Sequence, residues 1–219
     1  MLPLYECPHV IFSGELQLIE HIQWHQCPPV QLVDTVTGSI PKEQTEVQVC
    51  WSSEALYIRF ECTDHYVLSE YTKRDDPLYE QDVIEVFIDV VGDGKQYIEL
   101  ELSPYNIVFD AKVVRSQHNQ HINVDASWDM KGLYTSVKPI EQSSKKGSVY
   151  LLKLPTSSLG KPARAGDAWR INFYRIDQDA FGCRQYQAWS PTGEVNFHRP
   201  NRFGKLLFQE GITQTKAKE

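Results

Sequence analysis

The sequence lacks a long apolar run and an excess of basic residues. No stretch of its 219 residues approaches the roughly 18 consecutive apolar residues of a membrane span, and the start at Met1 to Pro8 lacks the charged and apolar regions of a signal peptide. The formal net charge of -7 repels nucleic acid and anionic membranes. We therefore predict no membrane partner, no nucleic-acid partner and, for the chain as given, a cytoplasmic location.

Metal-binding and redox motifs are also missing. The five cysteines are odd in number and form no C-x-x-C pair, so neither a zinc site nor a disulfide framework is predicted. His118 and His121 have the spacing of two metal ligands, but no third ligand follows at a recognised interval. Met130, the one internal methionine, gives little support to haem binding. The residue pattern by itself predicts no cofactor.

Long helical patterns are absent, and alternating patterns of β-strands take their place. Helix-like periodicity is confined to short pieces such as 155–159. Strands are predicted at 31–33, 45–51, 55–63, 83–91, 96–102, 107–115, 132–140, 148–154, 168–177, 185–189 and 203–209. This pattern predicts an all-β fold, a two-sheet antiparallel β-sandwich of the immunoglobulin or jelly-roll kind with short helical pieces.

The chain contains no internal repeat and no linker rich in Gly or Ser, which favours one domain. Residues 1–29 contain four prolines and are predicted to form an irregular N-terminal extension, in which 16–22 fits a short helical turn or an edge segment. The β-sandwich is expected over 30–210. Residues 211–219 are expected to be a frayed polar tail.

The stretch from Tyr79 to Asp89 is the most informative one. Its strand alternates aliphatic residues with Glu85, Phe87 and Asp89, so one face is aliphatic and the other carries acids and an aromatic ring. Aromatic rings and acids together suit a sugar, because a pyranose has an apolar face of C–H groups and a rim of hydroxyls. This polar and aromatic face is therefore a candidate sugar-binding surface.

A hairpin is predicted to extend this face. The turn at 92–95 contains an Asp-Gly pair and joins 83–91 to 96–102, which brings Glu85 near Glu99 and Glu101. Two carboxyl groups at roughly 5 to 10 Å are what glycoside hydrolysis requires. A polar sheet face balanced by Arg59, Arg115 or Arg175 is the alternative interpretation.

Several segments in a specific order resemble the family 9 carbohydrate-binding modules and their relatives, over most of 30–209. They are Leu56 to Phe60 followed by Asp64, Tyr79-Glu80-Gln81-Asp82 running into Ile84 to Asp89, Trp169 to Phe173, Trp189-Ser190, and Pro200 to Gly204. Modules of that family are non-catalytic β-sandwiches that clamp a terminal sugar between two aromatic side chains. The resemblance implies an oligosaccharide or polysaccharide partner and a part in carbohydrate metabolism.

The resemblance also implies which residues form the site. Tyr79 and Phe197 stand where the modules place the two clamping tryptophans, so a sugar is expected to stack more weakly here. Glu85 corresponds to an acid that accepts a hydroxyl. The strand 172–175 is expected to contribute a polar group, for which Arg175 is favoured over Tyr174, and Trp189 and Arg199 are expected to line the pocket. Some members bind structural calcium, but its ligands cannot be traced, so calcium stays open.

Three functions are open at this point. Non-catalytic carbohydrate binding is favoured. The second is a glycoside-processing enzyme or subunit that uses Glu85 with Glu99 or Glu101, and the third is a structural or partner-binding sandwich that has lost the site. Such modules usually work outside the cell, so either this protein acts on internalised sugars or the resemblance marks fold more than function.

Overall fold

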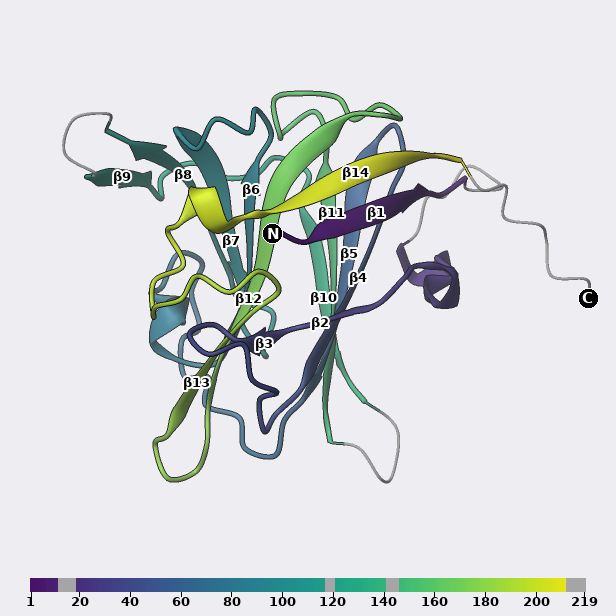
Figure 1. Ribbon diagram of the computed structural model, residues 1–219. Helices are drawn as coiled ribbons and strands as arrows, with labels where there is room; N and C mark the ends of the chain where they lie inside the picture. Colours follow the sequence, from purple (N-terminus) through teal and green to yellow (C-terminus); the bar gives the residue numbers. More distant parts are fainter. Residues whose placement is uncertain (12–18, 117–120, 141–145, 212–219) are drawn as a thin grey trace, which may run out of the picture.

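The computed structural model describes residues 1–11, 19–116, 121–140 and 146–211, and their regular secondary structure is almost entirely β (Figure 1). No helix among them is both long and apolar enough to cross a bilayer. The 3-10 turns are η1 (Ile19–His21), η2 (Trp24–Gln26), η3 (Leu78–Glu80) and η4 (Pro200–Arg202). The strands are β1 (Leu4–His9), β2 (Val30–Gln31), β3 (Val33–Asp34), β4 (Thr45–Trp51), β5 (Ala55–Thr63), β6 (Val83–Asp89), β7 (Gln96–Leu102), β8 (Val108–Arg115), β9 (Ile122–Asp125), β10 (Tyr134–Pro139), β11 (Gly147–Pro155), β12 (Ala168–Gln178), β13 (Arg184–Ala188) and β14 (Gly204–Gly211).

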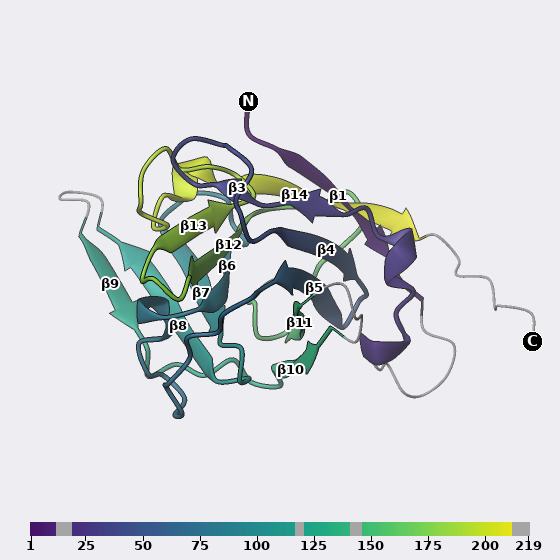
Figure 2. The same ribbon diagram turned by 90° about the horizontal axis from the view of Figure 1, so that it is seen from below.

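The strands form one unclosed sheet that bends into two facing layers, which confirms the predicted β-sandwich. Its order is β10-β11-β5-β4-β1-β14-β12-β6-β7-β8-β9, with β13 also paired to β12. Figures 1 and 2 show β4, β5, β10 and β11 on one side and β6, β7, β8 and β12 on the other. Neighbouring strands are antiparallel except β1, which runs parallel to β14 and β4. The layers are thus joined through β1 and β14.

The space between the layers is filled by the aliphatic face predicted for β6. Ile84, Val86 and Ile88 are fully buried there, together with alternate residues of β7, β5 and β11. Trp169 and Phe173 of β12 complete this core. Burial of each large apolar side chain contributes about 1.5–3 kcal/mol, so this face fixes the register of the central hairpin.

The opposite face of β6 and β7 is buried as well, although period two alone predicts a surface. Phe87 and Tyr97 pack there in a second apolar cluster with Tyr174, Phe197 and Phe203. Tyr186 of β13 packs against the same cluster, so β13 and the segment up to η4 cover this face. The face that positions the acids is therefore an interior one.

The hairpin turn between β6 and β7 is held by the last acid of β6. Gly92 and Gly94 adopt positive φ values of 80° and 71°, as the tight turn requires. Their amides donate to Asp89 Oδ1 and Oδ2 at 2.6 and 2.7 Å. Asp89 thus closes the turn. The other two β6 residues of this face, Glu85 and Phe87, line the cavity described below.

The N-terminal segment differs from the irregular extension predicted for 1–29. Residues Leu4–His9 form β1 and pair with β14 from Leu4↔Lys205 to Cys7↔Phe208. The buried Tyr5 hydroxyl donates to Pro28 O at 2.7 Å and accepts from the Val49 amide at 2.8 Å. The first residues of the chain therefore belong to the sandwich. Residues 212–219, most of the predicted tail, lie outside the described part.

Candidate functional site

A cavity of about 610 Å³ opens on the covered face of β6, β7 and β8. This volume lies within the usual range of small-molecule sites. Side chains of β6, β7 and β8 line one part of it. Residues of η3, β9, β12 and β13, together with Ala126 and the segment 195–198, supply the rest. The lining residues are Tyr79, Glu85, Phe87, Glu99, Glu101, Phe109, Val124, Ala126, Ile176, Arg184, Tyr186, Val195, Asn196, Phe197 and His198.

Three glutamates gather at one side of this cavity. Glu85 of β6 stands directly opposite Glu101 of β7, and Glu99 lies two residues away on the same face. A carboxylate oxygen from each lies within 4.8 Å of those of the other two. Their exposures are 2%, 6% and 0% for Glu85, Glu99 and Glu101, so all three carboxyl groups are almost out of water. Period-two alternation on two paired strands is what brings them together.

Burial makes these carboxyl groups hold their protons. It raises the pKa of Glu99 to about 8. Burial and the neighbouring Glu99 raise the pKa of Glu85 well above its usual value, and burial followed by Glu85 and Glu99 does the same for the pKa of Glu101. Glu85 Oε1 and both Glu101 oxygens have no hydrogen-bond partner among the described residues. A protonated carboxyl group can both donate and accept, as binding of hydroxyl groups requires.

His198 adds a neutral polar group beside them. Its Nδ1 is hydrogen bonded to the Tyr97 hydroxyl at 2.9 Å, and its Nε2 lies 3.7 Å from Glu99 Oε1. Burial, and secondly Arg115, lower the pKa of His198 to about 4, so the imidazole is uncharged at neutral pH. His198 therefore gives the three acids no compensating positive charge.

The two predicted clamp residues both line the cavity. Tyr79, on η3, is 50% exposed at its rim. Phe197 is nearly buried and stacks on Tyr174, with ring centroids 4.1 Å apart and planes at 12°. Since Tyr174 covers one face of the Phe197 ring, only the other face is available to a ligand. The structure thus brings Tyr79, Glu85 and Phe197 to one cavity, and their role in binding stays a prediction.

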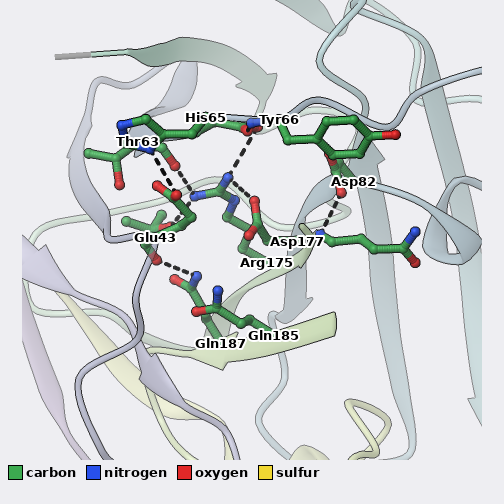
Figure 3. Close-up of polar contacts among 12 residues, drawn as sticks. Glu43, Thr63, His65, Tyr66, Asp82, Arg175, Asp177, Gln185 and Gln187 are labelled. Carbon is green, nitrogen blue, oxygen red and sulfur yellow. Dashed lines mark hydrogen bonds and ion pairs between the residues drawn. The ribbon is translucent and has the colours of Figure 1, made fainter. Parts of the chain in front are cut away.

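Arg175 lies elsewhere, contrary to its expected place in the pocket. Successive residues of β12 point to opposite faces, so Tyr174 lies on the cavity side and Arg175 at the far side of the sheet. Figure 3 shows its guanidinium donating to Asp177 Oδ1 at 2.5 Å and to Thr63 O at 2.8 Å. Asp64 Oδ2 lies 3.3 Å away. Arg175 therefore binds the protein's own acids.

The acids around Arg175 are buried strongly enough to resist ionisation. Burial raises the pKa of Asp64 to about 7 and that of Asp177 to about 6, even though Arg175 opposes both shifts. Asp82 is the third acid of this group, and its carboxylate accepts the amides of Leu68 and Gln178 at 2.6 and 2.8 Å. This cluster joins β5, β12 and the loop before β6.

Trp189 and Arg199 are also away from the cavity lining. Trp189 packs in the main core, where a Cβ on Gly204 would lie 2.2 Å from its ring, so the glycine makes room for the indole. Arg199 forms a partly exposed ion pair with Glu194. The pocket role expected for both came with the family resemblance, and the structure does not bear it out.

Three groups of acidic side chains among the described residues are candidates for a structural calcium site. Two of them already enclose an arginine: Arg175 serves one, and Arg74 is paired with Asp110 and Asp129 in the other. The third is the glutamate group of the cavity. Calcium usually takes six to eight oxygen ligands, and the other cavity walls are mainly aromatic and aliphatic, so this group is a poor calcium site. His118 lies outside the described residues.

Several lining residues were not predicted. Asn196 and His198 flank Phe197 in the sequence, and Tyr186 lies on the strand paired with β12. The sequence signal was weak, because the segment 190–203 has no regular alternation of apolar and polar residues. Its approach to β6 and β7 depends on long-range packing.

The fold and the cavity define a β-sandwich of the ligand-binding class. The family described as "Carbohydrate family 9 binding domain-like" matches residues 21–211 of this chain. The chain therefore belongs to that family, whose modules bind carbohydrate without catalysis.

One relative matches most of this chain. A protein from Arthroderma benhamiae named "Extracellular protein" is 25% identical over 202 residues, which cover 85% of this chain and 90% of the relative. Its name does not support the predicted cytoplasmic location.

Solved structures show the same fold. A putative carbohydrate-binding protein from Bacteroides uniformis has a TM-score of 0.76 at 15% identity, with 95% of this chain and 100% of that chain covered. A family 9 module from Caldicellulosiruptor kristjanssonii in complex with cellotriose has a TM-score of 0.65 at 16% identity and coverage of 99% and 97%. Its complex with glucose gives 0.63 at 16% identity, with 98% of each chain covered.

Proposed function

We propose that this protein binds a sugar unit of an oligosaccharide or polysaccharide in the cavity between Tyr79 and Phe197, without catalysing its cleavage. The observation that carries the proposal is that Phe197, distant in sequence, meets Tyr79 and Glu85 at one cavity of about 610 Å³. Family membership and the sugar complexes of the Caldicellulosiruptor module support the same class of ligand.

The cavity offers the two kinds of contact that a sugar needs. The exposed Tyr79 ring provides a surface for the apolar C–H face of a pyranose, and the part of the Phe197 ring that lines the cavity provides another. The carboxyl groups of Glu85 and Glu101 have free oxygens that can exchange hydrogen bonds with hydroxyls. Such bonds relieve buried groups that otherwise lack partners, so they favour binding.

Replacing Tyr79 by alanine tests the aromatic contact. We expect Tyr79→Ala to weaken binding at least tenfold, about 1.4 kcal/mol, because it removes the largest exposed ring at the cavity rim. Titration calorimetry with a glycan panel that includes glucose and cellotriose measures this. Tyr105→Ala is the matched control, since Tyr105 is 67% exposed and does not line the cavity. Unchanged affinity of Tyr79→Ala would contradict the proposed contact.

Glycoside processing is the second candidate, because the structure brings the carboxylate oxygens of Glu85, Glu99 and Glu101 within 4.8 Å of one another. Hydrolysis, however, uses two carboxyl groups that flank the scissile bond, with one of them ionised. Here all three acids lie on one sheet face and tend to hold protons. Turnover of chromogenic glycosides that Glu85→Gln abolishes would favour the enzyme. Sugar binding without turnover would favour the module, and failure of the whole glycan panel a sandwich that has lost its site.

A further inference from the structure

The three glutamates of the cavity form the one acidic group among the described residues that lacks an internal cation. In the Asp64, Asp82 and Asp177 group, Arg175 supplies a guanidinium. In the Asp75, Asp110 and Asp129 group, Arg74 does so. No Lys or Arg side chain of the described residues forms an ion pair with Glu85, Glu99 or Glu101.

The other polar groups near these glutamates do not replace that cation. Tyr97 and Tyr174 are held un-ionised by burial, and His198 is neutral. Arg184 lines the cavity but forms no ion pair with the three glutamates; its Nε donates to Gln178 Oε1 at 3.2 Å, and its charge acts on Asp82. The charge of Arg115 lowers the pKa values of Tyr97 and His198. Glu85 Oε1 and both oxygens of Glu101 form no hydrogen bond of standard geometry, at 2% and 0% exposure, and only the Tyr79 backbone amide lies near enough to Glu101 to lower its pKa. The cavity thus presents a buried acidic group that is open to a positive ligand.

The surroundings favour an organic cation over a metal ion. A calcium ion needs six to eight oxygen ligands, whereas the other walls carry Phe87, Phe109, Phe197 and aliphatic side chains. Aromatic rings attract an ammonium group and also accept the apolar body that carries it. The fitting ligand therefore combines a sugar-like body with an ammonium group.

We propose that the cavity selects an amino sugar, a glucosamine-type unit whose ammonium group lies against Glu85, Glu99 and Glu101 where the other two acidic groups hold an arginine. The inference rests on the proposed sugar site and names the class of sugar. The ammonium donates to the free glutamate oxygens, and the ring stacks on Tyr79. An N-acetylated sugar carries no such charge, so the cavity discriminates against it.

Binding of an ammonium group is coupled to loss of protons from the glutamates. The cation favours their ionised forms, so binding releases protons to the buffer. Affinity for the amino sugar is therefore expected to rise with pH as long as the amine stays protonated. A neutral sugar is expected to show no such rise.

The test compares three β-1,4-linked disaccharides by titration calorimetry at about pH 6, where the amine is charged. They are the glucosamine dimer, its di-N-acetylated form and cellobiose. We expect the glucosamine dimer to bind at least tenfold more tightly than the other two. Equal or tighter binding of cellobiose would overturn the amino-sugar inference and leave the proposed sugar site standing. Failure of all three to bind would count against both.

Charge-removing variants locate the effect. Glu101→Gln and Glu99→Gln keep the side-chain shape, and each is expected to reduce the ratio of glucosamine-dimer to cellobiose affinity at least threefold. Glu6→Gln removes an exposed acid of β1 that does not line the cavity, and it is expected to keep the ratio. A ratio unchanged in both cavity variants, with their folding verified by circular dichroism, would overturn the inference. A preference that appears only with added calcium and disappears with chelator would also overturn it.

Discussion

Tyr174 and Arg175 are neighbours in sequence whose side chains have different tasks. The Tyr174 ring stacks on Phe197 with ring centroids 4.1 Å apart, while Arg175 forms ion pairs with Asp64 and Asp177 at the other side of the sheet. The resemblance to the family suggested a polar residue from this strand, and Arg175 was favoured over Tyr174. A difference of one residue along a strand exchanges the face, so only the register of β12 on β6 assigns the roles.

Arg175→Met is expected to destabilise the protein by about 3–5 kcal/mol, because it leaves buried acids without their cation. The loss should be larger at pH 8 than at pH 5, since Asp64 and Asp177 ionise as the pH passes about 7 and about 6. Urea unfolding at both pH values measures it. Arg199→Met is the control, with an expected effect of about 0–1 kcal/mol for a partly exposed pair. Equal stability of the two variants would refute a structural role of Arg175.

At the scale of elements, β1 shows how a proline-containing segment becomes part of the sheet. Its parallel pairing with β14 satisfies one edge, whereas its backbone meets β4 at His9↔Trp51 alone. The Tyr5 hydroxyl spans the remaining gap by bonding to Val49 on β4. A side chain thus replaces ladder hydrogen bonds where β1 diverges from β4.

Tyr5→Phe is expected to lower stability by about 1–3 kcal/mol, since the buried Val49 amide loses its acceptor. The midpoint of urea unfolding measures the effect. The control is Tyr134→Phe, which removes an exposed hydroxyl bond to Glu20 and should change stability by less than about 0.5 kcal/mol. A Tyr5→Phe protein as stable as the control variant would show that β1 needs no such link to β4.

For the whole molecule, the buried acids predict a stability that falls as the pH rises from about 6 to 8. The pKa of Glu99 is about 8 in the folded protein against 4.5 for a free side chain, and those of Asp64 and Asp177 are about 7 and about 6 against 3.8. An acid whose pKa is raised by folding contributes its full stabilisation at pH values below its pKa in the unfolded chain. This contribution is lost as the pH rises through its pKa in the folded protein. His198 acts oppositely, because its pKa of about 4 against 6.5 removes stability below about pH 6.5.

Unfolding midpoints measured across this range test the balance of these groups. Glu99→Gln should flatten the decline between about pH 6 and 8, because that side chain no longer titrates. Glu6→Gln, at an exposed position of β1, should leave the slope as it is. An identical slope in wild type and Glu99→Gln would show that Glu99 does not contribute to the pH dependence.

The sequence by itself determined the strands, the facing layers and the two faces of the hairpin from 83 to 102, because period-two alternation is a local property of the chain. It also placed Tyr79, Glu85 and Phe197 together through resemblance. Only the tertiary structure decided that the acidic face is covered, that Arg175 points away from the cavity, and that β1 joins the sheet. Those outcomes depend on contacts between segments distant in sequence. The most important is the aperiodic segment around Phe197, which covers the acidic face of β6 and β7 and so encloses the cavity.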